Sequence, residues 1–205
     1  MTPMSRGRHA CGFTLIELLT VIAIVAVLMS LLFAAIGGAM DKAKRTQALN
    51  DIHQLVAAIN AYNEEYGRYP VRQDQTGTQV TYRTDNSDLL YTLRAVPQGA
   101  NADNALNPRG IVFLDVPNAK NPSDPRGGIA NGIWFDPWGR QPGKAESGIY
   151  HVRIDAAYRG YVNDPYPGSY DASGGRPIVR TGAIAWSLAK GGLQTYELRD
   201  QVISW

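Results

Sequence analysis

The chain has 205 residues, of which 44% are hydrophobic, and its formal net charge is +2. That length accommodates one folded domain with appended segments rather than two full domains. Arg6 and Arg8, near the start, account for the excess charge, and the rest of the chain is balanced. No charge pattern therefore indicates binding to nucleic acid or to acidic lipid. A single cysteine, Cys11, excludes a framework of intrachain disulfides.

A long apolar segment follows a short polar and basic start. Residues 18–36 are nineteen residues in which only Thr20 and Ser30 interrupt the apolar run. As a helix this run would span about 28 Å, close to the roughly 30 Å hydrocarbon core of a bilayer. The pattern predicts a transmembrane helix over residues 13–40, preceded by a polar and basic segment over residues 1–12.

The position of Gly12 predicts how this start is processed. A secretory signal has an apolar region of about 7–15 residues, with small residues at a cleavage site after it. Here Gly12 stands before the apolar segment, which is the order expected if processing removes residues 1–12 as a leader and keeps the helix. An uncleaved signal anchor and a conventional signal cut near residues 35–37 are the two alternatives.

The start of the apolar segment resembles the leader junction of type IV pilins and of type II secretion pseudopilins. The matching residues are 12–19 (Gly-Phe-Thr-Leu-Ile-Glu-Leu-Leu) and 21–24 (Val-Ile-Ala-Ile). The resemblance implies cleavage between Gly12 and Phe13 by a prepilin peptidase, followed by N-methylation of Phe13. It also implies a single-pass protein of the inner membrane whose C-terminal domain lies in the periplasm. Positive charges flank both sides of the segment, so charge alone does not set this orientation.

Glu17 is the single ionisable side chain within residues 13–40. A carboxylate within a membrane costs about 2.5–3.5 kcal/mol on insertion scales, so we expect it to be paired. The implied cleavage frees an α-amine on Phe13, and we expect this amine of one subunit to meet Glu17 of its neighbour during filament assembly. The alternative is a carboxylate near a helix N-terminus, where the helix dipole favours it and headgroup water solvates it.

The helical pattern continues beyond the apolar segment to residue 66. Apolar residues recur at spacings of three and four, and Gly67 and Pro70 then end the pattern. We expect an amphipathic continuation of the helix over residues 41–66, in which His53 is an ordinary exposed residue. The pair Gly37-Gly38 either permits bending or local melting, or allows close packing at the membrane surface.

Residues 67–205 are expected to form a periplasmic globular domain. Short apolar runs between turn residues predict a helix over residues 87–93 and several short strands. The predicted fold class is α+β, a pilin-like fold in which a long N-terminal helix packs on a small antiparallel β-sheet. Residues 98–132 and 163–176 are expected to be the loosest segments. The predicted strands are residues 111–114, 132–135, 150–154, 178–179 and 183–188. The alternation over residues 150–154 is typical of a half-buried strand, so one of its faces is expected to meet water.

Residues 136–139 (Asp-Pro-Trp-Gly) are similar to a turn that precedes the sheet in the major pseudopilin of type II secretion. Proline presets the backbone of a turn and glycine supplies freedom in φ. We interpret this stretch as a well-made hairpin turn with no further role.

The C-terminal residues 186–188 and 200–205 resemble the final loop and strand of the same family, where a calcium ion is common. The resemblance assigns Asp200, Ser187 and Leu188 to such a site. However, Gly191-Gly192 and Lys190 replace the expected acidic pattern, and calcium needs 6–8 oxygen ligands. A loop held by hydrogen bonds and packing is the alternative.

The sequence contains no recognisable catalytic motif. The histidines His9, His53 and His151 lack metal-site spacing, and no nucleophile motif or phosphate loop is present. We therefore predict that the chain is not an enzyme and that it has no cofactor, with calcium as the one candidate.

The resemblance implies a structural subunit of a type II secretion pseudopilus, which polymerises through its N-terminal helix to support protein export. Its implied partners are copies of itself, minor pseudopilins, the prepilin peptidase, membrane lipid, and an inner-membrane assembly platform with its ATPase. One alternative is a type IV pilus subunit that serves adhesion, motility or DNA uptake. The other is a monomeric, membrane-anchored binding module.

Overall fold

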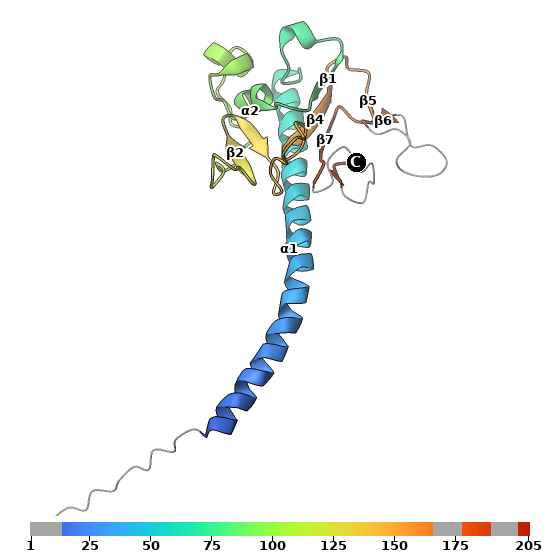
Figure 1. The fold of residues 1–205 in the computed structure, drawn as a ribbon. Coiled ribbons are helices and arrows are strands. Elements are labelled where there is room, and N and C mark those ends of the chain that lie inside the picture. The colour runs from blue at the N-terminus through green and yellow to red at the C-terminus, as the bar shows by residue number, and fades with distance from the viewer. Residues whose placement is uncertain (1–13, 166–177, 190–200) are drawn as a thin grey trace, which may run out of the picture. The chain divides into compact units, whose positions relative to one another are not determined.

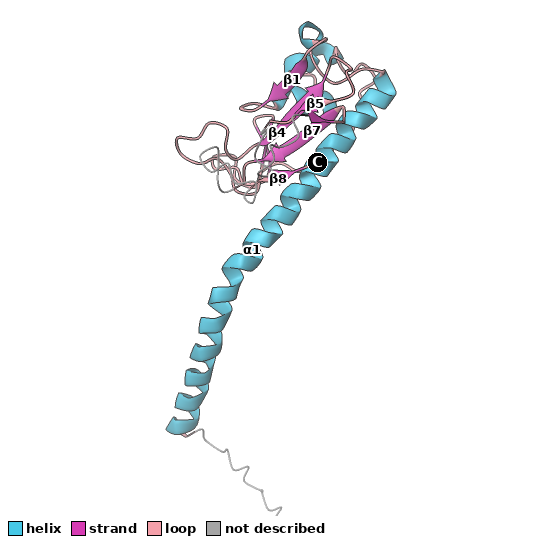
Figure 2. Ribbon diagram, turned by 90° about the vertical axis from the view of Figure 1, so that its right-hand side faces the viewer, coloured by secondary structure: helices cyan, strands magenta, loops and turns pink. Residues whose placement is uncertain are grey.

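The computed structural model describes residues 14–165, 178–189 and 201–205, apart from the side chains of residues 31, 32, 34 and 35. The chain divides into two compact units, Met1–Ala43 (unit 1) and Lys44–Trp205 (unit 2). Helix α1 (Leu15–Tyr66) belongs to both units, and the other described helices and strands belong to unit 2 (Figure 1, Figure 2). The predicted α+β class is confirmed.

Helix α1 is a continuous α-helix of 52 residues. It ends where the sequence predicted, because Gly67 adopts a left-handed φ of 64° and its N–H closes the last turn on the Asn63 carbonyl at 2.8 Å. The helix continues through Gly37 and Gly38, so local melting is not seen, and no described atom lies within 4 Å of a Cβ built at either position. Phe13, the predicted first residue, lies outside the described residues.

The remaining elements of unit 2 are two short 3₁₀ helices, a second α-helix and eight strands among the described residues. Helix α2 forms over the residues that the sequence predicted, whereas β1, β2 and β5 were not predicted. In chain order the elements are η1 (Gln73–Gln75), β1 (Gln79–Tyr82), α2 (Ser87–Leu93), η2 (Gly99–Asn104), β2 (Gly128–Ala130), β3 (Ile133–Phe135), β4 (Tyr150–Asp155), β5 (Val162–Asn163), β6 (Ile178–Val179), β7 (Ala183–Ser187) and β8 (Val202–Ile203).

The main sheet is antiparallel, as predicted, with strand order β1-β4-β7-β8. Strand β4 is central, and its Val152 lies opposite Tyr82 on β1 and Ala185 on β7. Two further strand pairs, β2-β3 and β5-β6, form separate two-stranded sheets. The unit 2 part of α1 packs on the main sheet and buries Ile52, Leu55, Ile59 and Tyr62 in one core with strand residues.

The prediction that β4 is half-buried was wrong. Tyr150, Val152 and Ile154 alternate into the core beneath α1, as the pattern indicated. The opposite face is also covered, because His151 and Asp155 are buried and Val162 packs in a cluster with Trp186, the neighbour of His151 on β7. The alternation of side-chain chemistry therefore located the strand correctly, but a second layer covers the face that we expected to meet water.

The prediction of a strand at residues 111–114 was also wrong. The backbone of Ile111 bonds to the side chain of Asn107, and the Phe113 N–H donates to the Leu93 carbonyl at 2.8 Å. The first part of residues 98–132, which were expected to be loose, is held in place, since Asn101 and Asn107 are buried and hydrogen-bonded within it. The side-chain amides of Asn101 and Asn107 bond backbone groups there, in place of a neighbouring strand. Of the other segment expected to be loose, residues 166–176 lie outside the described residues.

Candidate functional site

The start of helix α1 is closed by a reciprocal pair of side chains, Thr14 and Glu17. The Thr14 N–H and hydroxyl donate to Glu17 Oε2 at 2.8 and 2.7 Å, and the Glu17 N–H donates to Thr14 Oγ1 at 3.3 Å. This is a capping box, in which Thr at the N-cap and Glu three residues later satisfy each other's backbone donors. In the single chain the Glu17 carboxylate therefore already has partners.

The structure only partly tests the three residues predicted to act in processing and assembly. Glu17 is described and exposed, whereas Gly12 and Phe13 lie outside the described residues. Cleavage, methylation and the pairing of Glu17 with an amine stay predictions. Thr14 is a residue that the sequence reasoning missed, although the Thr-x-x-Glu spacing was the signal for it.

The unit 1 part of α1 exposes a long apolar surface. Its hydroxyl groups are turned to the helix itself, since Thr20 donates to the Glu17 carbonyl at 2.9 Å and Ser30 to the Val27 carbonyl at 2.7 Å. Contiguous apolar surface of this kind marks a site that contacts protein or membrane. The exposed apolar side chains are Leu15, Ile16, Leu18, Leu19, Val21, Ile22, Ile24, Val25, Val27, Leu28, Met29, Phe33, Ile36 and Met40.

Over the part of the chain that the structure describes, none of the helices combines the length and the apolar character needed to cross a membrane.

In unit 2 the buried residue Asp136 connects distant parts of the chain. Its Oδ1 accepts hydrogen bonds from the backbone N–H groups of Trp138 and Gly139, both at 3.0 Å, and its Oδ2 accepts the Ser187 hydroxyl at 2.6 Å. Burial raises the pKa of Asp136 to about 6, although these hydrogen bonds and the Lys44 charge act to lower it. The predicted turn over residues 136–139 is confirmed, but its first residue also ties the turn to the end of β7.

The residues predicted for a calcium site are only partly described. The Ser187 hydroxyl is already engaged, because it donates to Asp136 and accepts the Ala189 N–H at 3.0 Å. Leu188 is buried in a small apolar cluster, and Asp200 lies outside the described residues. The described residues contain no group of three or more His, Cys, Asp or Glu side chains arranged to hold a metal ion. Calcium binding stays a prediction.

The two described histidines lie in different environments. His53 is exposed on α1, as predicted. His151 on β4 is buried, with its ring stacked on Trp186 at a centroid distance of 5.3 Å. Burial lowers the pKa of His151 to about 4, so it is a neutral core residue at physiological pH.

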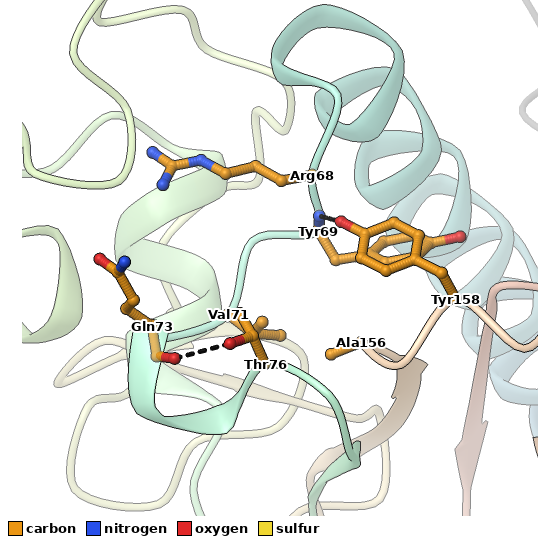
Figure 3. Close-up of a pocket in the computed structure, with 7 residues that line it drawn as sticks. All are labelled: Arg68, Tyr69, Val71, Gln73, Thr76, Ala156 and Tyr158. Atoms are coloured by element: carbon orange, nitrogen blue, oxygen red, sulfur yellow. Dashed lines mark hydrogen bonds between the residues drawn. The ribbon is translucent and has the colours of Figure 1, made fainter.

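A pocket of about 180 Å³ lies beside the end of α1, where the residues after Tyr66 meet the turn after β4 (Figure 3). No sequence pattern indicated it, because its walls come from segments far apart in the chain. The residues that line it are Arg68, Tyr69, Val71, Gln73, Thr76, Ala156 and Tyr158.

Comparison with known proteins adds two findings to this geometry. Residues 7–33 match the family model described as the prokaryotic N-terminal methylation motif. This range contains the predicted cleavage junction and the Thr14–Glu17 pair. No solved structure gives a significant match to the chain.

The matching curated proteins are named type II secretion system core protein G. That of Klebsiella michiganensis is 36% identical over 98 residues, which cover 45% of this chain and 69% of the relative. That of Pseudomonas aeruginosa is 28% identical over 166 residues, covering 80% of this chain and 97% of the relative. That of Pectobacterium carotovorum is 38% identical over 78 residues, so the match covers 38% of this chain and only 50% of that relative's length.

Proposed function

The chain belongs to the family of type II secretion system core protein G, the major pseudopilin, and from that premise we propose that it is a structural subunit of a pseudopilus. In this proposal the subunits polymerise through the N-terminal half of helix α1 and support protein export. The observation that carries the proposal is the apolar surface of α1, which the described part of the chain leaves exposed and which begins within the matched methylation motif.

The apolar surface needs a partner both before and after assembly. Before assembly, membrane lipid covers it, and the globular unit stands in the periplasm, anchored to the inner membrane. In the filament, the helices of neighbouring subunits cover it instead. Helices that pack against each other outside water are held by close contacts and by the pairing of polar groups. Within residues 13–40, Glu17 is the ionisable side chain that needs such a partner.

Glu17 exchanges its partner during assembly in this proposal. In the single chain the Thr14 N–H and hydroxyl bind the carboxylate. A prepilin peptidase hydrolyses the peptide bond between Gly12 and Phe13, which frees the α-amine of Phe13 next to Thr14. A methyl donor then transfers a methyl group to this amine. The amine of an incoming subunit then binds Glu17 of its neighbour, and the capping box keeps the carboxylate from being buried without a partner until that moment.

The partners in this proposal are those that the family implies. Copies of the chain and minor pseudopilins form the filament, and an inner-membrane platform with its ATPase supplies the work of extension. A calcium ion at Asp200, Ser187 and Leu188 belongs to the proposal as a stabiliser of the C-terminal loop. Because the Ser187 hydroxyl is bonded to Asp136, Ser187 would contribute its carbonyl oxygen.

The calcium site is tested by thermal unfolding of the periplasmic unit. A ligand that binds only the folded state raises its melting temperature with concentration. Excess calcium should raise the melting temperature of the wild type and leave that of Asp200→Asn unchanged. A wild-type melting temperature that is the same in calcium and in chelator would remove the ion from the proposal.

Three measurements test the proposed function. Mass spectrometry of the membrane-extracted protein should find a mature chain that begins at a methylated Phe13. Glu17→Leu should leave this processing intact but sharply reduce the yield of filaments. Cysteines placed along residues 13–36 should give a ladder of crosslinked oligomers. An intact start, a cut beyond the apolar segment, or a single crosslinked band with no ladder would each contradict a pseudopilus subunit.

A further inference from the structure

The pocket beside the end of α1 has the size of a side-chain site. Its volume of about 180 Å³ is below the range of roughly 300–1,000 Å³ that small-molecule sites occupy. Buried Val71 and Ala156 provide apolar surface, and the exposed residues Gln73 and Thr76 lie at its edge (Figure 3). The pocket therefore suits one apolar side chain of another protein better than a cofactor.

One wall of the pocket is a tyrosine that the fold holds in an unfavourable conformation. Tyr158 has a φ of 56° and a side chain that is 56% exposed. Its N–H donates to the Asp155 carbonyl at 3.1 Å, and its hydroxyl accepts the Tyr69 N–H at 3.1 Å. The rings of Tyr69 and Tyr158 stack with their centroids 5.3 Å apart. Bulky residues rarely adopt positive φ, and such strain persists where surrounding contacts impose it, often at functional sites.

The pocket also carries a positive charge that the described residues do not neutralise. Arg68 donates to the Leu106 carbonyl at 3.3 Å, and it has no ion pair within the described residues. Arg72, nearby in the chain, instead pairs with Asp74 at 3.2 Å. An acidic group of a partner would therefore find an available guanidinium at this pocket.

A second surface of unit 2 presents the complementary features. Val112 is 57% exposed although the residues on both sides of it are fixed. Asn107 Nδ2 donates to the Ile111 carbonyl at 2.7 Å, and Phe113 packs edge-on against Tyr62 with centroids 5.4 Å apart. A rigidly held apolar side chain loses little conformational entropy when it is buried in an interface.

An acidic residue lies three positions after this valine. Asp115 is exposed between the buried residues Leu114 and Val116, and it has no hydrogen bond or ion pair in the described part of the chain. An exposed valine followed by an unpaired acid matches a pocket that offers an exposed tyrosine and an arginine without an acidic partner.

The two surfaces are formed by different residues of unit 2. The pocket lies between the residues after α1 and the turn after β4, whereas Val112 and Asp115 lie in the segment between η2 and β2. Among the described residues of unit 2, the large apolar side chains that are exposed are Leu49, Val112 and Tyr158. A contact between two different patches of identical subunits is heterologous, and such contacts propagate into open helical filaments when the rotation between subunits does not close a ring.

We propose that Val112 of one subunit packs into the Tyr158 pocket of the next subunit, with Asp115 facing Arg68. This contact rests on the proposed function, since it requires that the chain polymerises. It would be a second interface, in the periplasmic unit, besides the contacts of the N-terminal helices.

A charge exchange in the full chain, expressed with its assembly machinery, tests the ionic half of the contact. Arg68→Glu and Asp115→Arg should each reduce the yield of filaments roughly two- to fivefold, the range expected for an exposed ion pair. The double variant restores opposite charges and should recover most of the yield. Asp124→Arg is the matched control, because its exposed pair with Arg126 lies outside both surfaces, and it should leave the yield unchanged. Only variants that melt like the wild type are compared.

Crosslinking tests the apolar half of the contact and separates it from the proposed function. In a Cys11→Ser background, Val112→Cys with Tyr158→Cys should give a ladder of oligomers with a short thiol-specific crosslinker, and either cysteine alone should give at most a dimer. Cysteines within residues 13–36 serve as the reference for polymerisation. A ladder from the helix cysteines but none from the 112/158 pair, or a charge-exchanged double variant no better than the single variants, overturns this contact. The absence of both ladders overturns the proposed function as well.

Discussion

The Tyr150 hydroxyl donates a hydrogen bond of 2.6 Å to Asp51 Oδ2, which joins the central strand β4 to helix α1. Burial raises the pKa of both groups above its ordinary value. This contact places a polar pair between the helix and the sheet, beside an apolar core that contains Ile52, Leu55 and Val152. Such a pair favours one register between helix and sheet, because a shifted register leaves both groups buried without a partner.

Replacing the tyrosine tests this role. Tyr150→Phe should lower the free energy of unfolding by about 1–3 kcal/mol, because it leaves the partly buried Asp51 carboxylate without its donor. Urea unfolding of unit 2 measures the change in the free energy of unfolding. The matched control is a double-mutant cycle with Asp51→Ala. The double variant should lose less free energy of unfolding than the sum of the losses in Tyr150→Phe and Asp51→Ala. Strict additivity would mean that the hydrogen bond contributes nothing to stability.

The buried His151 predicts a specific dependence of stability on pH. Its pKa is about 4 in the folded state against 6.5 unperturbed, so the unfolded chain takes up the proton first. The contribution of the neutral imidazole is complete above pH 6.5 and is lost as the pH falls to about 4, with a slope of up to about 1.4 kcal/mol per pH unit. Asp136 acts in the opposite sense, because its folded pKa of about 6 exceeds the ordinary 3.8 and its protonated form stabilises the fold at low pH.

The two opposing groups can be separated by single variants. Relative to the wild type, His151→Gln should become more stable as the pH falls from 6.5 to 4, and Asp136→Asn should become less stable over the same range. Urea unfolding at half-unit steps of pH provides the comparison. If His151→Gln follows the wild-type pH profile, the imidazole is not held neutral in the folded protein.

Gly182 and Tyr69 give a steric prediction. A Cβ at position 182 would clash with the Tyr69 hydroxyl group. The φ of Gly182 is not in the left-handed region, so Gly182→Ala tests contact and not backbone strain. It should destabilise the unit by about 1–3 kcal/mol, the usual cost of overpacking. Tyr69→Phe in the same chain removes the clashing oxygen and should recover part of the loss in melting temperature. If Tyr69→Phe recovers none of the lost melting temperature, the clash with the Tyr69 hydroxyl is not the cause of the destabilisation.

The capping box makes a prediction that is independent of filament assembly. Thr14→Val removes the hydroxyl that binds Glu17 and should weaken the first turn of α1 by about 0.5–2 kcal/mol. Hydrogen exchange of the detergent-solubilised protein should then be faster at the Glu17 amide, whereas Thr14→Ser should protect it like the wild type. Equal exchange in Thr14→Val and wild type would show that the box does not form in solution.

Local patterns in the sequence predicted those elements whose signals are themselves local. The end of α1 follows from Gly67, and α2 follows from the spacing of Leu89, Leu90 and Leu93 over a single short helix. The alternation in β4 located that strand for the same reason. The resemblance over residues 12–19 drew attention to Glu17, although it did not reveal the Thr14 hydroxyl that binds it.

The sequence by itself therefore determined the helix, its apolar half, its end and the family junction at its start, because periodicity and turn residues act over a few neighbouring positions. Only the tertiary structure decided which polar groups meet. Asp136 binds Ser187 from 51 residues away, and Tyr150 binds Asp51 from 99 residues away. Asn107 holds residues 111–114 out of a strand. Hydrogen-bond partners are chosen by proximity in the folded chain, and no local spacing encodes that proximity.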